Sequence, residues 1–281
     1  MRLVRHPDAD TFLRDAREEL ERSEALHGLI LGVAAGARSA PAGAAARYLA
    51  TVRDGAGLAL AALMTPPHPL VLAGDRAEAG GALDALAADL LAAGARPTAA
   101  VGPGALAEGF AECWARAAGT EARVAMRQRI HALTEVRPLP SVPGELRRAG
   151  EADRERVAGW LEAFDREALG LADPEQARAL AGRRIAAGEV WLWEDGEPRS
   201  MAASARPTRH GVAVNAVYTP PEQRGRGYAT ACVAALSRRL LAGGRRFCVL
   251  YTDLANPTSN AIYARIGYRP VGDSTLVRFA A

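Results

Sequence analysis

The 281-residue sequence contains no lysine, because all of its 35 Lys-plus-Arg positions are arginines. This absence excludes a lysine that forms a Schiff base with a carbonyl substrate. It also excludes the Walker phosphate loop, in which a Gly-Lys pair binds nucleotide phosphates.

Cysteine and histidine are scarce as well. The three cysteines, Cys113, Cys232 and Cys248, are widely spaced and form no C-x-x-C pair. The five histidines form no H-x-x-x-H pair. These spacings argue against a disulfide framework and against a zinc site, so we expect no metal.

Long apolar runs and clustered charge are also lacking. The first residues, "MRLVRHPDAD", are charged, and the alanine-rich runs are broken by glycine or charge. We therefore expect neither a signal peptide nor a membrane span, and a cytoplasmic protein without a membrane partner. The net charge is only +3, and the arginines are interleaved with acids, which argues against a nucleic-acid partner.

The hydrophobic fraction of 49% permits a sizeable core, and the apolar pattern predicts alternating helices and strands. In the first half, residues 8–36 are helical, and a hairpin at 45–67 turns at Asp54-Gly55. A strand at 69–74, a helix at 76–94, a strand at 98–102, a helix at 104–119 and a strand at 121–136 follow.

Residues 137–144, "RPLPSVPG", contain three prolines and predict a linker. The second half then repeats the order of the first, with helices at 151–169 and 174–188, a hairpin around Asp195-Gly196 and a strand at 211–219. A helix at 228–244, a strand at 247–252, a helix at 259–267 and a strand at 274–279 complete it. We interpret the chain as two copies of one α/β unit, divided into residues 1–140 and 141–281.

The stretch "TPPEQRGRGYAT" (219–230) connects a predicted strand to a predicted helix. Unpaired N–H groups at a helix start attract anions, and glycines let the backbone approach a ligand closely. Arg224 and Arg226 add forked donors that suit phosphate oxygens. The pattern therefore predicts a phosphate cradle; the alternative is a solvated surface turn.

A dinucleotide-binding fold is the first ligand class to consider for this cradle, and it does not fit. Its G-x-G-x-x-G pattern would need a third glycine where Thr230 stands. Asp253 does end the next strand, but only 28 residues follow it, too few to complete such a sheet.

The segment Arg224–Ala229, "RGRGYA", resembles the acetyl-CoA pattern Q/R-x-x-G-x-G/A of the GNAT superfamily of acetyltransferases. The segment 252–270, "TDLANPTSNAIYARIGYRP", is similar to the family's next strand-to-helix motif and follows in the expected order. The match covers about residues 145–281. It implies an α/β (α+β) fold of two tandem GNAT-like domains, each with a mixed, mostly antiparallel sheet flanked by helices.

The resemblance also implies roles for individual residues. Val217, Tyr218 and Thr219 would pair with the pantetheine arm of acetyl-CoA as an added strand, and their backbone N–H groups would hold the oxyanion. The pyrophosphate would bind at Arg224, Gly225, Arg226, Gly227, Tyr228, Ala229 and Thr230. Asn256, Ser259 and Asn260 would contact the pantetheine or pyrophosphate region.

Tyr263 would act as the general acid that protonates the departing thiolate; the alternative is an aromatic packed under the last helix. Many relatives place a Glu base on the strand before the phosphate loop, but this strand, "VAVNAVY", carries Asn215 and no acid. The base is therefore unknown, and Glu162, Asp165 and Glu167 are weak candidates that could also attract a cationic amine.

The first half lacks the cradle, since "LAGDRAEAGGAL" does not match it, and Trp114 stands near the place of Tyr263. We expect a catalytically silent copy. The chain as a whole is predicted to transfer an acetyl group from acetyl-CoA to the primary amine of a small molecule, or less favourably of a peptide, as a monomer or homodimer. The alternatives are a CoA-binding regulatory or sensor protein, and transfer of a longer acyl group.

Overall fold

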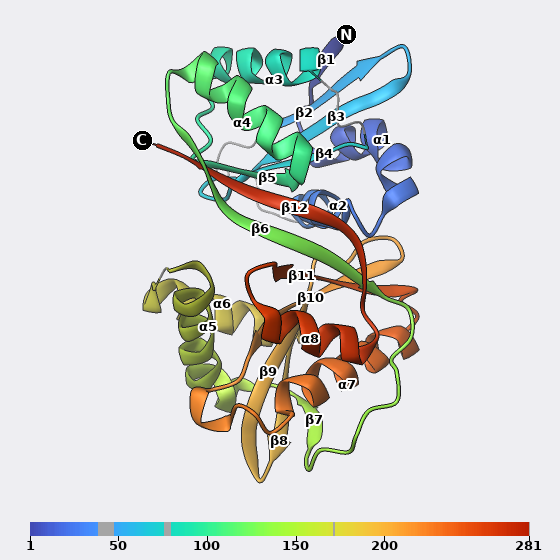
Figure 1. Ribbon diagram of the computed structural model, residues 1–281, viewed down its shortest axis with the longest axis vertical. Coiled ribbons are helices and arrows are strands. Elements are labelled where there is room, and N and C mark those ends of the chain that lie inside the picture. The colour runs from blue at the N-terminus through green and yellow to red at the C-terminus, as the bar shows by residue number, and fades with distance from the viewer. Residues whose placement is uncertain (39–47, 76–79, 171, 281) are drawn as a thin grey trace. The chain divides into compact units, whose positions relative to one another are not determined.

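The structure is a computed structural model that describes residues 1–38, 48–75, 80–170 and 172–280 (Figure 1). The chain forms two compact units. Unit 1 comprises Met1–His131, Tyr251–Pro257 and Pro270–Ala281, and unit 2 comprises Ala132–Leu250 and Thr258–Arg269. The units do not follow one boundary along the chain, so the division into residues 1–140 and 141–281 stays a prediction.

Unit 1 has three layers. The elements of the first half are β1 (Arg2–Arg5), α1 (Ala9–Leu20), η1 (Glu21–Ser23), α2 (Gly28–Ala37), β2 (Tyr48–Asp54), β3 (Gly57–Met64), β4 (Leu70–Ala73), α3 (Gly80–Ala92), β5 (Ala99–Pro103), α4 (Gly104–Ala118) and β6 (Ala122–Leu133). Helices α3 and α4 pack on one face of the strands, and α1 and α2 pack on the other (Figure 1).

Unit 2 repeats this arrangement. The elements of the second half are β7 (Glu145–Arg148), η2 (Glu151–Asp153), α5 (Arg154–Leu169), α6 (Pro174–Ala186), β8 (Val190–Asp195), β9 (Glu197–Ala205), β10 (Gly211–Tyr218), η3 (Pro221–Gln223), α7 (Tyr228–Ala242), β11 (Phe247–Asp253) and α8 (Pro257–Ile266). The end of β11 and the first residue of α8 belong to unit 1. One hydrophobic core lies between α7, α8 and one face of the strands. A second core lies between α5, α6 and the opposite face of the strands.

Local sequence signals explain where many of these elements begin and end. Asp8 caps α1 by accepting a hydrogen bond from the Thr11 N–H, and Asp173 caps α6, whose first residue is Pro174. Gly119 ends α4 in the left-handed conformation. The hairpin between β8 and β9 turns at Gly196, as the sequence predicts.

The sheets are mixed and mostly antiparallel, which confirms the predicted fold class. In unit 2, β7, β8, β9 and β10 pair antiparallel in that order, and β10 pairs parallel with β11. In unit 1, β1 to β4 pair antiparallel and β4 pairs parallel with β5. The parallel pair occupies the same place in both copies of the element order.

Three features differ from the sequence-based expectations. The helical region 8–36 is divided into α1, η1 and α2, with a break before Gly28, and β1 precedes it. The final strand β12 (Arg269–Phe279) pairs antiparallel with β5 in unit 1, from Ser274 opposite Pro103 to Arg278 opposite Ala99. The expected starts of the strand at residue 45 and of the helix at residue 76 lie outside the described residues.

The predicted linker, residues 137–144, has no helix or strand but is packed rather than free. Leu139 and Val142 lie against the core beside α7, and the Arg137 N–H donates a hydrogen bond to the Ile266 carbonyl. Apolar side chains between the prolines therefore fasten this segment to unit 2.

Candidate functional site

Strand β10 is kinked in its second half. Asn215 pairs with Ala203 of β9 and Tyr218 pairs with Met201, so Ala216 and Val217 together face the single residue Ala202. Ala216 takes a left-handed conformation with φ 48°, which is unusual for a residue other than glycine. This β-bulge bends the end of the strand. Bulges and non-glycine residues with a left-handed backbone are over-represented at functional sites.

The bulge coincides with a gap in the sheet. Over the described residues, the parallel pairing of β10 with β11 runs only from Gly211–Phe247 to Ala213–Val249. Val214 to Tyr218 thus have no β11 partner on that side. Backbone groups that lack a ladder partner can pair with an extended ligand, as the predicted role of Val217, Tyr218 and Thr219 requires.

The glycine turn follows directly. After η3, Gly225 has φ 78° and Gly227 has φ 84°, both in the left-handed region that favours glycine. Gly227 precedes α7 and offers no side-chain cap, so the first N–H groups of α7 point forward without a capping partner. A Cβ at Gly227 would lie 3.2 Å from Cγ2 of Val142, so the linker packs beside the turn.

The two arginines of the turn have different surroundings. Arg224 Nη2 donates to both carboxylate oxygens of Glu167, at 2.9 and 2.7 Å, and Arg224 Nε donates to the Thr219 carbonyl at 2.9 Å. Arg226 is exposed, and no hydrogen bond or ion pair to it is seen in the described part of the chain. Arg226 is therefore the arginine that an anion can reach without displacing a carboxylate.

Tyr228 has its side chain in the core. It is buried, and its hydroxyl donates to Asp195 Oδ2 at 2.8 Å. The hydroxyl thus anchors the start of α7 to the end of β8, and the side chain is held in the core. Ala229 and Thr230 lie half-buried in the first turn of the helix.

Ser200, a residue that the sequence did not single out, fixes the end of β10. Its buried hydroxyl lies 3.0 Å from the Tyr218 carbonyl and 2.9 Å from Thr219 Oγ1. A lone serine on a hairpin strand carries no sequence signal for such a role. The bulge at Ala216 likewise has none, because alanine does not favour a left-handed backbone.

Tyr263 lies on α8 in unit 2, half-buried, with its ring 6.0 Å from that of Tyr268 in a T-shaped contact. Burial, with a smaller effect of Cys232, raises the pKa of the Tyr263 phenol, so its hydroxyl stays protonated at neutral pH. Ser259 and Asn260 lie in the first half of the same helix, and Asn256 lies in the turn before it, in a segment that belongs to unit 1.

The three acids suggested as bases lie along α5. Glu162 forms an ion pair with Arg166, and Glu167 forms one with Arg224 and accepts a hydrogen bond from the Tyr218 hydroxyl at 3.3 Å. Asp165 is half-buried; burial raises its pKa, and the positive charge of Arg184 partly opposes that shift. Two of the three candidates are thus engaged by arginines within ion-pair distance.

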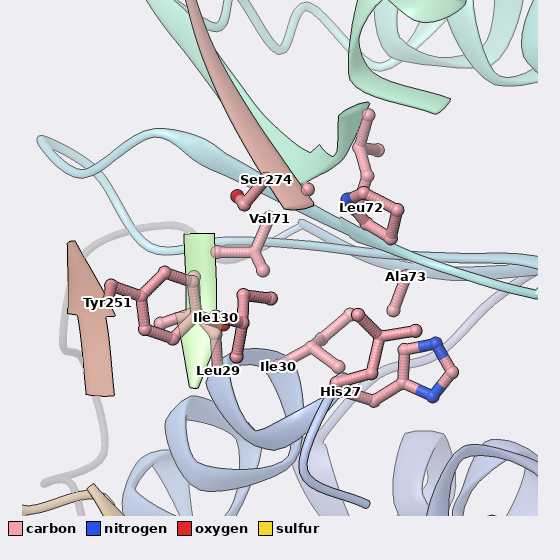
Figure 2. Close-up of a pocket in the computed structure, with 12 residues that line it drawn as sticks. His27, Leu29, Ile30, Val71, Leu72, Ala73, Ile130, Tyr251 and Ser274 are labelled. Carbon is pink, nitrogen blue, oxygen red and sulfur yellow. The ribbon is translucent and has the colours of Figure 1, made fainter. Parts of the chain in front are cut away.

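The corresponding place in unit 1 is nearly filled. At the ends of β4 and β5, a Cβ on Gly102 would lie 2.6 Å from the Leu72 carbonyl oxygen, so the two strands lie close together. Figure 2 shows the remaining cavity, lined mainly by apolar side chains such as Leu29, Ile30 and Val71. Its volume of ≈ 10 Å³ is room for about one water molecule.

Trp114, near the place expected to correspond to Tyr263, is buried in the core of unit 1. Its ring stacks on Phe110 and contacts Phe279, each with centroids 6.2 Å apart. It is a packing residue. Part of the segment 74–80, where a second cradle would stand, lies outside the described residues.

Among the described residues, no group of three or more His, Cys, Asp or Glu side chains is arranged to hold a metal ion. None of the helices in the described ranges is long and apolar enough to cross a membrane.

Comparison with known proteins supports the resemblance. Residues 194–277 match the family model described as FR47-like protein. A comparison with curated protein sequences finds no significant match.

Solved structures share the fold over almost the whole chain. A GCN5-related N-acetyltransferase from Sphaerobacter thermophilus matches with TM-score 0.62 and 18% identity, over 98% of this chain and 95% of its own. An acetyltransferase of the GNAT family from Colwellia psychrerythraea matches with TM-score 0.58 and 12% identity, over 99% of both chains. A tandem GNAT protein from the clavulanic acid biosynthesis pathway matches with TM-score 0.54 and 16% identity, over 99% of this chain and 98% of its own.

The similarity covers both halves, since these matches extend over 98–99% of the chain. The chain therefore has the fold of these acetyltransferases, including the tandem GNAT protein, and residues 194–277 also match the FR47-like family model.

Proposed function

We propose that the protein is an acetyl-CoA-dependent N-acetyltransferase that acetylates the primary amine of a small molecule by direct attack in a ternary complex. The observation that carries this proposal is the place where β10 leaves β11. There an unpaired strand edge runs directly into a glycine turn and an uncapped helix start. Such a strand edge fits a pantetheine arm, and such a helix start fits a pyrophosphate.

Unit 2 would supply the binding groups. The backbone of Val217 to Thr219 would pair with the extended arm, and the N–H groups that follow Gly227 would bind the phosphates together with Arg226. Arg224, held by Glu167, would orient the turn and meet the phosphates only if that ion pair opens. Bound acetyl-CoA supplies the activated acetyl group.

The residues around the reacting atoms would hold charge and protons. Backbone N–H groups at the bulge would stabilise the negative charge that develops on the acetyl oxygen. Tyr263 would donate its hydroxyl proton to the departing sulfur, and its raised pKa keeps that proton in place until then. The proton that the amine loses would pass to solvent or to a base that the sequence leaves unknown.

Calorimetry with acetyl-CoA tests this proposal on the full chain and on Gly227→Glu, which puts a carboxylate into the turn. Gly244→Glu is the matched control, because Gly244 also has a positive φ, 94°, and lies just beyond the other end of α7. We expect binding in the micromolar range for the natural protein and the control, and loss of binding for Gly227→Glu. Absence of binding by the natural protein would sink the proposal.

A sensor without turnover is the second candidate, and the missing acid on β10 favours it. A thiol-release assay with a panel of amines separates the two functions. Binding of acetyl-CoA without release of CoA from any amine, or from any longer acyl-CoA, would favour the sensor.

A further inference from the structure

Asn215 stands at the start of the β10 bulge with a buried polar atom that lacks a partner. Its Oδ1 has almost no exposed surface, and no donor reaches it within the described residues. A buried carbonyl oxygen without a hydrogen bond is costly, so proteins seldom keep one without a use. The strand edge beside Asn215 is also the edge that β11 leaves unpaired.

The register shows which way this amide points. Asn215 is paired with Ala203, and directly paired residues share a face of the sheet. Ala203 and Ala216 belong to the core under α5 and α6, whereas Val214 belongs to the core under α7. The side chains of Asn215 and Ala216 therefore both project toward α5 and α6, from the face of the sheet that these two helices cover.

The charged side chains on the helices that cover this face of the sheet are balanced. Helix α5 carries Glu162 with Arg166, and Glu167 with Arg224 and the Tyr218 hydroxyl. It also carries Asp165, on which Arg184 of α6 acts. Each acid thus has an arginine near it. On the same face, neighbouring β9 contributes the small side chains of Ala203 and Ala205. Glu222 of η3 also acts on Tyr218, but it is exposed and screened by solvent, so the described acids of α5 leave an ammonium ion no unbalanced carboxylate to pair with.

We propose that Asn215 is a positioning residue whose amide oxygen accepts a hydrogen bond from the acceptor nitrogen. The site then selects an amine with a sizeable uncharged fraction near neutral pH, such as an α-amino group, over an alkyl amine that is almost wholly protonated there, such as a lysine side chain. An amide oxygen can accept a hydrogen bond from either form, but it cannot take a proton or balance a charge. This inference rests on the proposed function.

The first test compares two probes in the thiol-release assay at pH 7, alaninamide and Nα-acetyl-lysine amide. An α-amino group has a pKa of about 7.8 and a lysine amine about 10.4, so their neutral fractions differ about 300-fold. We expect kcat/KM of the natural protein to favour alaninamide by about that factor, and to rise with pH along the ionisation of the amine itself. A preference for the lysine probe would overturn the inference.

The second test changes Asn215. In Asn215→Asp, a carboxylate of the same size can balance an ammonium and accept its proton, so the preference for alaninamide should fall at least tenfold. In Asn215→Ala, kcat/KM for alaninamide should fall about tenfold through KM, because a hydrogen bond is lost. Ser204→Ala is the matched control: Ser204 pairs with Val214 on the adjacent strand, on the opposite face.

Acetyl-CoA binding, measured on the same variants, distinguishes a failure of the inference about Asn215 from a failure of the proposed function. The affinity should be unchanged by the Asn215 substitutions. If the natural protein binds acetyl-CoA but acetylates neither probe, the inference is overturned and the cofactor site stands. If Asn215→Asp lowers kcat/KM for both probes by the same factor, the role of Asn215 is only structural and the inference is overturned. If acetyl-CoA does not bind, the proposed function fails and this inference fails with it.

Discussion

Tyr263 carries the most specific chemical role at the scale of single residues. Tyr263→Phe removes the proton donor while keeping the T-shaped contact with Tyr268. We expect kcat to fall about 10²-fold, with acetyl-CoA affinity unchanged, because general acid catalysis acts in the transition state. Single-turnover kinetics with a pre-bound complex measure this change.

Tyr268→Phe is the control for that experiment. Its hydroxyl lies 2.9 Å from Ser237 Oγ in the core, so this variant should lose stability and keep kcat. An equal fall of kcat in both variants would contradict the acid role of Tyr263.

The raised pKa of Asp165 predicts that the stability of the protein depends on pH. Burial raises the pKa of its carboxyl in the folded state, so the native protein holds this proton more tightly than the unfolded chain does. The contribution of Asp165 to the free energy of unfolding is therefore lost as pH rises from the unfolded pKa, about 3.9, through the folded one.

Asp165→Asn removes the ionisable carboxyl, and with it the loss of unfolding free energy at higher pH. The variant should match the natural protein near pH 3 and exceed it in urea midpoint at pH 7. Glu145→Gln, at an exposed carboxyl on β7, should show no such trend. A difference between Asp165→Asn and the natural protein that does not change with pH would contradict the expectation.

At the scale of elements, the Glu167–Arg224 pair joins the last turn of α5 to the glycine turn. Both side chains are 48% exposed, so solvent and salt screen their attraction. A double-mutant cycle with Glu167→Gln and Arg224→Gln should give a coupling of about 0.5 kcal/mol in low salt and less at 0.5 M salt, measured by urea unfolding.

The same pair affects the cofactor site. Glu167→Gln releases Arg224, which can then bind phosphate, so acetyl-CoA affinity should rise about threefold. A fall in affinity would mean instead that the ion pair holds the turn in its binding conformation.

The elements also differ in how far the sequence predicts them. The Asp195-Gly196 hairpin and the turn at Gly225 and Gly227 follow from local backbone preferences, since glycine tolerates a positive φ. The break between α1 and α2 and the bulge at Ala216 do not, because packing against other strands and helices overrides weak local propensities there.

At the scale of the whole molecule, the C-terminal strand stabilises the unit that the N-terminal half builds. Val277 and Phe279 of β12 lie in the core of unit 1, with the Phe279 ring 6.2 Å from Phe110. Phe279→Ala should cost about 3 kcal/mol of stability by leaving a cavity. Hydrogen exchange should then quicken in α4 and β5.

The elements of unit 2 provide the internal control for that experiment. Exchange in β8 and β9 should be unchanged, since Phe279 belongs to unit 1. Faster exchange confined to unit 2 would contradict this assignment of the C-terminal strand.

Sequence alone determined the repeated order of helices and strands, the glycine turn before α7 and the resemblance of its motifs to GNAT acetyltransferases. These features depend on periodicity and backbone preference within a few residues, which any short segment carries with it. Tertiary structure decided the rest. The end of the β10–β11 pairing, the partner of Arg224, the buried amide of Asn215 and the place of β12 all depend on contacts between residues far apart in the chain. Such contacts are set by packing of whole layers, for which a single sequence carries no local signal.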